Sequence, residues 1–170
     1  MKTLFVLLVF SVWCSLIMSG CYSFSGASVP PHLKTIAIPL VDDQSGFGQP
    51  NLREEVTAAL TREFIDDNTL EIAERRLADS ILEGAIVSVS DVPLVLAQGE
   101  QGQKVGLQRV TVAVKVTYED LKLKKTVWEK TFTNTGEYDP AGGFSAREDA
   151  LKEAIRKITE DVLLDTVSGW

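Results

Sequence analysis

The chain has 170 residues, with 17 Lys and Arg against 24 Asp and Glu, which gives a formal net charge of −7. This acidic balance argues against a general attraction to nucleic acid or to an anionic membrane surface. Any anionic ligand would therefore have to bind at a local cluster of basic residues.

The first residues have the composition of a secretory signal. Lys2 precedes the apolar run 4–18, and a positive start followed by a short apolar core is typical of a signal peptide. The run has about 15 residues, whereas a membrane-spanning helix needs ~20. Its end, Met-Ser-Gly-Cys at 18–21, resembles a bacterial lipobox, in which small residues precede the cysteine that accepts diacylglycerol. We expect residues 1–20 to be removed and Cys21 to be lipid-modified.

The rest of the chain divides into a tether and one domain. Residues 21–34 are rich in Ser, Gly and Ala, and Pro30 and Pro31 prevent a helix there. Residues 35–170 have a length typical of a single domain. Since Cys14 is lost with the signal and Cys21 carries lipid, no disulfide can form within the mature chain. The hydrophobic core must therefore hold the fold together.

The first half of the domain predicts a strand followed by an amphipathic helix. The apolar run 35–41 has the length of a strand, and the polar, Gly-rich residues 42–50 indicate a loop. A helix then begins at Asn51, with Glu54 reaching back in a capping box, and it ends at 66–68. Apolar residues spaced three and four apart place one face of this helix in the core: Leu52, Val56, Ala59, Leu60 and Phe64.

Three further strands are predicted in the middle of the chain, over 80–89, 109–119 and 126–136. The second is the clearest, because valines alternate with polar residues along it, so that one face is buried and the other is wetted. Residues 98–106 contain three glycines and indicate a loop or a hairpin tip. Residues 70–73 are either a short strand or an extended edge.

The last part of the chain predicts a second amphipathic helix, which begins with a capping box at Ser145 and Glu148. The order of elements is β-α-β-β-β-α, with one possible extra short strand. This order predicts an α+β fold, in which two amphipathic helices pack on one face of a four-stranded mixed sheet. The core face of the second helix carries Leu151, Ile155, Ile158 and Val162.

No pattern in the sequence favours catalysis. His32, the only histidine, lies in the tether, where neither a metal site nor a buried triad can be built around it. The sequence has no GxSxG, HExxH, P-loop or dinucleotide fingerprint. The paired carboxylates at 42–43 and 66–67 are interpreted as solvated turn residues, and the glycines 142–143 as a turn before the helix rather than a phosphate site. We expect no enzymatic activity, no metal and no cofactor.

Several segments carry a family resemblance through their order and spacing. They are Cys-Tyr-Ser-Phe-Ser-Gly-Ala-Ser-Val-Pro-Pro at 21–31, Lys-Thr-Ile-Ala-Ile at 34–38, the helix 52–64, Arg-Val-Thr-Val-Ala-Val-Lys-Val at 109–116, Trp-Glu-Lys-Thr-Phe at 128–132 and the acidic helix that leads to Trp170. Together they resemble the LptE family of lipopolysaccharide-assembly lipoproteins, in the branch found in Bacteroidota and Chlorobi-like bacteria.

The resemblance implies an outer-membrane lipoprotein that plugs the LptD β-barrel, helps this barrel assemble and contacts lipopolysaccharide during its transport to the outer leaflet. Tyr22, rather than Asp, follows the cysteine and agrees with outer-membrane placement, with the domain facing the periplasm or inside the barrel lumen. The expected partners are the barrel, lipopolysaccharide and the membrane that holds the acyl chains, with no nucleic acid. Because lipopolysaccharide carries phosphates, the candidate ligand-binding residues are basic: Lys104, Arg109, Lys122, Lys124 and Lys125. The lysines at the hairpin are equally suited to keeping that hairpin soluble.

A second family likeness remains open. The strand 35–40, followed by a polar loop, also resembles the first strand of LpoB- and CsgG-like lipoproteins, which activate cell-wall synthases or form secretion pores. A pore is disfavoured, since the sequence lacks a hairpin of ~10-residue alternating strands with an apolar outer face.

Overall fold

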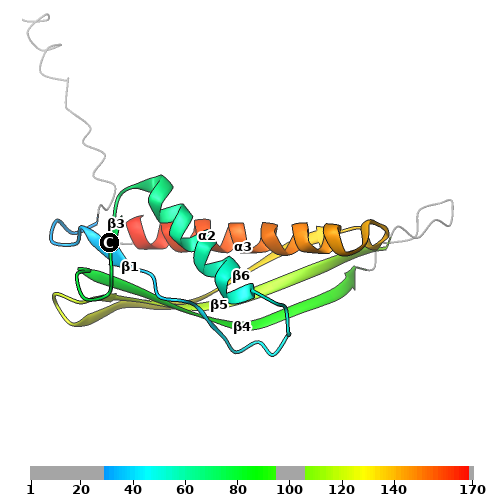
Figure 1. The fold of residues 1–170 in the computed structure, drawn as a ribbon, viewed down its shortest axis with the longest axis horizontal. Coiled ribbons are helices and arrows are strands. Elements are labelled where there is room, and N and C mark those ends of the chain that lie inside the picture. Colours follow the sequence, from blue (N-terminus) through cyan, green and yellow to red (C-terminus); the bar gives the residue numbers. More distant parts are fainter. Residues whose placement is uncertain (1–28, 95–105, 169–170) are drawn as a thin grey trace, which may run out of the picture.

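The computed structural model describes residues 29–94 and 106–168, which form one mixed sheet with two helices on one side of it (Figure 1). The predicted α+β class is confirmed. The helices are α2 (Leu52–Asp67) and α3 (Gly143–Ser168), with a short 3₁₀ turn, Pro140–Gly142, before α3. The strands are β1 (Thr35–Ala37), β2 (Asp42–Asp43), β3 (Glu71–Ile72), β4 (Ser80–Leu94), β5 (Leu107–Asp120) and β6 (Lys125–Tyr138).

In the described part of the chain the sheet has six strands, so the predicted number of four is wrong. Its order is β3-β1-β4-β5-β6, and β2 pairs with β4 further along that strand. Strands β4, β5 and β6 are antiparallel, whereas β1 and β2 run parallel to β4. The two additional strands, β2 and β3, have two residues each. Strand β3 falls at the possible short strand 70–73, which is thereby confirmed, whereas β2 falls in the predicted loop 42–50. Segments this short have no periodicity, so only their partners across the sheet define them.

The core lies between the sheet and the helices. Along β5 the alternation predicted from the sequence is confirmed, because Val110, Val112, Val114, Val116 and Tyr118 are all buried. Helix α3 packs along β5 and β6. Helix α2 packs mainly against α3 and reaches the short strands β2 and β3. The predicted packing of both helices on the sheet therefore differs in detail, because α3 is the helix that packs along the long strands β5 and β6.

Both predicted capping boxes are wrong. Asn51 adopts a left-handed conformation with φ 60°, and its side chain makes no capping hydrogen bond to α2. Helix α3 begins at Gly143, before the predicted cap at Ser145, because a 3₁₀ turn leads directly into it. The Asp139 carboxylate starts that turn by accepting a hydrogen bond of 2.8 Å from the amide of Ala141. The predicted turn before the helix is confirmed at Gly142, the last residue of the 3₁₀ turn, whereas Gly143, with φ 64°, is already the first residue of α3.

The packed structure includes residues that precede β1. Leu33 is only 4% exposed and belongs to the core, and its amide donates a 2.9 Å hydrogen bond to the carbonyl of Pro30. The first described residues are therefore fixed on the domain.

Candidate functional site

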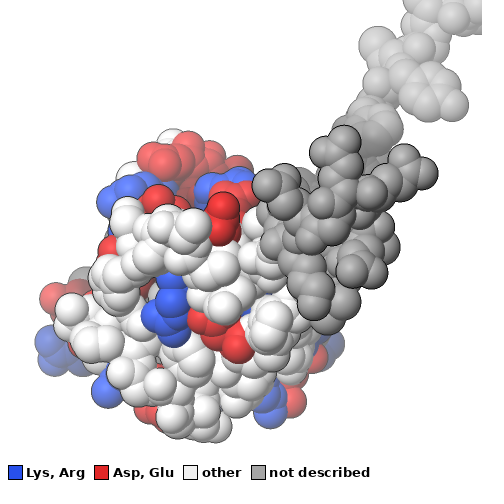
Figure 2. All heavy atoms as spheres, turned by 90° about the vertical axis from the view of Figure 1, so that its right-hand side faces the viewer, with Lys and Arg blue, Asp and Glu red and all other residues white. Residues whose placement is uncertain are grey.

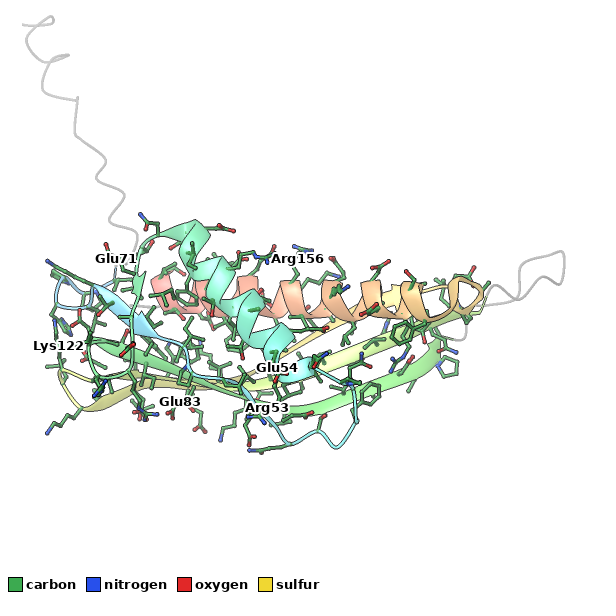
Figure 3. The ribbon with its side chains drawn as sticks, viewed as in Figure 1. Arg53, Glu54, Glu71, Glu83, Lys122 and Arg156 are labelled. Carbon is green, nitrogen blue, oxygen red and sulfur yellow. The ribbon has the colours of Figure 1, made fainter. Side chains whose placement is uncertain are left out.

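The predicted basic residues that the structure describes lie at opposite ends of the sheet. Lys122, Lys124 and Lys125 lie at or beside the β5–β6 turn, whereas Arg109 lies near the other end of β5. Lys104 lies outside the described residues. We call the β5–β6 turn, residues 121–124, and the neighbouring β3–β4 connection, residues 73–79, the hairpin end. Lys122 lies at this end in Figure 3.

Lys122 binds protein groups rather than projecting freely into solvent. Its ammonium group lies 2.8 Å from Asp79 Oδ1 and donates a 2.6 Å hydrogen bond to the carbonyl of His32. The other oxygen of Asp79 accepts hydrogen bonds from the amides of Lys34 (2.8 Å) and Thr35 (3.3 Å). Lys122 therefore joins the β5–β6 turn to the first residues of the domain.

The charge of Asp79 is stabilised by these contacts. The hydrogen bond from Lys122 lowers the pKa of the Asp79 carboxyl below its ordinary value, and the backbone amides of Lys34 and Thr35 lower it further, against the opposing effect of partial burial. A carboxylate that accepts several hydrogen bonds favours its ionised form in this way.

His32 makes a second link at the same end, although the sequence assigned it to a tether. Its Nε2 lies 2.6 Å from Oδ2 of Asp120, a carboxyl that is only 2% exposed. Burial raises the pKa of Asp120, but the hydrogen bonds from His32 and from the amide of Leu123 outweigh this effect and lower the pKa overall. Within the residues that the structure describes, no group of His, Cys, Asp and Glu could hold a metal ion.

At the opposite end, Arg109 is paired with an acidic neighbour. Its Nε donates a 3.1 Å hydrogen bond to Oε1 of Glu137, which lies opposite it on β6. This pairing neutralises part of the charge that Arg109 could offer to an anionic ligand. In the view of Figure 2, which faces this end, acidic and basic side chains are interspersed among uncharged residues.

A partly buried polar network, not foreseen from the sequence, lies close to Arg109. Arg147 Nε donates a 2.8 Å hydrogen bond to Oδ2 of Asp91, and the Tyr138 hydroxyl lies 2.9 Å from the same oxygen. The Arg147 guanidinium also lies 5.1 Å from the ring centre of Phe47. Burial raises the pKa of the Tyr138 hydroxyl, and Asp91 raises it further. The network joins the loop after β2 to β4, β6 and α3.

A groove of about 510 Å³ runs between α2 and α3 on the side away from the sheet. Its floor is apolar, formed by Ala58, Ala59 and Ile155, and charged side chains form its rim. At this groove burial raises the pKa of Glu55, while Lys152 acts in the opposite direction. Arg156, another rim residue, projects above α3 in Figure 3.

The sheet face opposite the helices is polar. It carries threonines and cross-strand charge pairs, among them Lys115 and Glu129 at 2.9 Å. Glu83 points away from the helices on this face (Figure 3) and pairs with Arg75 at 2.9 Å. The sheet is therefore apolar on its inner face and suited to water or to a polar partner on its outer face.

Two further findings concern membranes and the proposed lipid site. Within the described ranges, 29–94 and 106–168, neither helix is both long and apolar enough to cross a bilayer. Cys21, the predicted lipid-modified residue, lies outside the described residues, as does the rest of the predicted signal and most of the tether.

Several solved structures share this fold. It is similar to the hypothetical protein CT253 from Chlamydia trachomatis (TM-score 0.58, 11% identity, covering 77% of this chain and 94% of that one). The fold is also similar to a PelC dodecamer from Paraburkholderia phytofirmans (TM-score 0.55, 15% identity, covering 85% of this chain and 95% of that one). Protein XCC0632 from Xanthomonas campestris is similar too (TM-score 0.56, 13% identity, covering 84% of this chain and 91% of that one). At such low identity these likenesses concern the fold alone.

The sequence comparisons are more specific about the family. None of the curated protein sequences compared with the chain matches it. A model of the LptE family, described as lipopolysaccharide-assembly, matches residues 33–166, from the first buried leucine to the last turns of α3. Because this match covers every described strand and nearly all of both helices, the chain belongs to the LptE family of lipopolysaccharide-assembly proteins.

Proposed function

We propose that this protein is an outer-membrane lipoprotein, lipid-modified at Cys21 after removal of residues 1–20, that plugs an LptD-type β-barrel. In this role it helps the barrel assemble, assists lipopolysaccharide transport to the outer leaflet and catalyses no reaction. The observation that carries the proposal is the family match over 33–166, which begins shortly after a lipobox-like sequence.

The polar outer face of the sheet supports a role as a plug. A domain inside a water-filled lumen must expose groups that remain hydrated or pair with a polar wall, and the interior of such barrels is polar. The Lys115–Glu129 pair and the exposed Thr131 and Thr133 meet this need.

The length of the sheet also fits this role. Strand β5 has 14 residues, which extend over ~45 Å at about 3.4 Å per residue. A bilayer with its headgroups is ~40–45 Å thick. A domain placed with β5 along the barrel axis could have its two ends near the two membrane surfaces. We assign lipopolysaccharide contact to the end that carries Arg109, with Lys104 in the segment just before β5.

Crosslinking in cells tests the plug. A photo-crosslinking residue at Thr133 should give an adduct with the LptD-type barrel, and depletion of the protein should reduce lipopolysaccharide at the cell surface. A Thr133 adduct with a penicillin-binding protein, together with unchanged surface lipopolysaccharide, would instead support the alternative of a cell-wall synthase activator.

Fractionation and mass spectrometry test the anchor separately. Cys21→Ser should move the protein out of the membrane fraction or leave it uncleaved, and the native protein should carry acyl chains on Cys21. An intact, unmodified methionine start would refute the lipid anchor without affecting the fold.

A further inference from the structure

The hairpin end exposes two leucines. Leu123 at the β5–β6 turn is 66% exposed, and Leu77 in the β3–β4 connection is 76% exposed. The two segments are adjacent, because the amide of Leu121 donates a 2.9 Å hydrogen bond to the carbonyl of Asp79. Exposed apolar side chains brought together at one end of a domain are typical of a contact surface.

Basic side chains surround these leucines. Lys124 and Lys125 are exposed, and neither forms an ion pair with any residue in the described ranges. Arg75 and Arg76 flank the other leucine, although each is paired with a glutamate. Lysine side chains beside apolar ones suit the boundary between lipid phosphates and acyl chains, because the aliphatic stem can be buried while the ammonium group stays hydrated.

The start of the domain is fixed at this same end. Lys122 binds the carbonyl of His32, and the His32 ring binds Asp120. Cys21 lies eight positions before Val29, the first described residue. Eight residues reach at most ~28 Å even when fully extended. A lipid on Cys21 would therefore keep the hairpin end close to the membrane surface.

We propose that the hairpin end is a membrane-contact surface, in which Leu123 and Leu77 enter the headgroup region of the leaflet that holds the Cys21 acyl chains. Lys124 and Lys125 pair there with phospholipid phosphates. The inference rests on the lipid anchor of the proposed function and adds to it a defined orientation of the domain, in which the hairpin end projects from the barrel lumen toward the leaflet that holds the acyl chains. One acyl chain binds a membrane only marginally, so additional apolar and basic contacts strengthen and orient the attachment.

A fluorescent probe at the turn tests the contact. The lipidated protein carrying Leu123→Cys is labelled with an environment-sensitive dye and reconstituted in vesicles of phosphatidylethanolamine and phosphatidylglycerol at 3:1. Phe144→Cys is the matched control, since Phe144 is 67% exposed and lies at the other end of the sheet. We expect the emission at position 123 to rise at least threefold with a shift to shorter wavelength, and the emission at position 144 to stay unchanged.

Charge reversal tests the role of the lysines. Adding Lys124→Glu and Lys125→Glu to Leu123→Cys should remove most of the emission change while circular dichroism stays unchanged. Equal emission at positions 123 and 144 would overturn the proposal, as would a change seen only when lipopolysaccharide is added to the vesicles. Mass spectrometry of the same samples measures acylation of Cys21 independently. It therefore distinguishes a protein that lacks the acyl group from an anchored protein whose β5–β6 turn stays in water.

Discussion

Gly136 in β6 lies directly against the backbone of Ala150 in α3. A Cβ atom added to Gly136 would lie 1.9 Å from the carbonyl oxygen of Ala150 and 2.8 Å from its Cα. The missing side chain therefore allows α3 to approach the sheet closely, and Ala150 itself is buried in the core. Neither atom can yield to a new methyl group without moving the whole helix.

Gly136→Ala should destabilise the protein by about 3 kcal/mol, because the methyl group has to displace helix backbone. Urea unfolding followed by tryptophan fluorescence measures the free energy of unfolding. Gly106→Ala is the matched control, since a Cβ there meets no atom within 4 Å. Equal losses in the two variants would contradict the close approach of α3.

Leu33→Ala should destabilise the domain by about 2–4 kcal/mol, since Leu33 is buried in the core and its truncation leaves a cavity. Leu164→Ala serves as control, because Leu164 is 58% exposed on α3 and should change stability by less than about 0.5 kcal/mol. Thermal or urea unfolding of both proteins gives the comparison. A stable Leu33→Ala protein would show that the segment before β1 contributes no packing.

Asp79 should contribute stability that depends on pH. Its pKa is lowered in the folded protein, so its contribution is present above its ordinary pKa of 3.8 and is lost as the pH falls through the lower, folded value. Asp79→Asn should therefore be less stable than the native protein at pH 7, and its stability should fall less between pH 5 and pH 2. Urea unfolding across this range measures both effects, and Lys122→Gln should reproduce part of them. Parallel stability curves for Asp79→Asn and native protein would exclude this role.

Glu153 should titrate at an unusually low pH. Hydrogen bonds from Arg156, whose Nη2 lies 2.7 Å from Glu153 Oε1, lower the pKa of Glu153 from 4.5 to about 2. In Arg156→Gln this pKa should rise only part of the way to 4.5, because Lys157 still lies 3.4 Å from the same oxygen. NMR titration of the carboxyl carbon measures it directly. An unchanged pKa in the variant would show that Arg156 is not the main partner.

The elements that the sequence predicted best carry their own local signal. The alternating valines of β5 define its buried face whatever their partners, and the three- and four-residue spacing of Leu52, Val56 and Leu60 defines a helix face. The short strands have no such signal. Asp42 becomes part of β2 only because it pairs with Ala85, and no pattern within residues 42–50 distinguishes that pairing from a loop.

The roles of charged side chains were harder to predict for the same reason. Lys122 was correctly located at a hairpin, but its partner Asp79 lies 43 positions earlier in the chain. The sequence assigns His32 to a tether, because its partner Asp120 lies 88 positions later in the chain. Such pairs follow from the topology of the sheet, and local spacing contains no information about them.

The parallel pairing of β1 has a consequence for how the molecule is built. Strands β4, β5 and β6 follow one another in the chain, joined by connections of 12 residues (95–106) and 4 residues (121–124), so their pairing loses little loop entropy. Strand β1 instead pairs with β4, which begins more than 40 residues later in the chain, so that Ile36 lies opposite Ser80. We therefore expect β1 to join the sheet after β4, β5 and β6 have paired. Backbone amides of β1 should therefore exchange hydrogen with solvent faster than those of β5. The sheet is then completed late, by the strand that comes first in the domain.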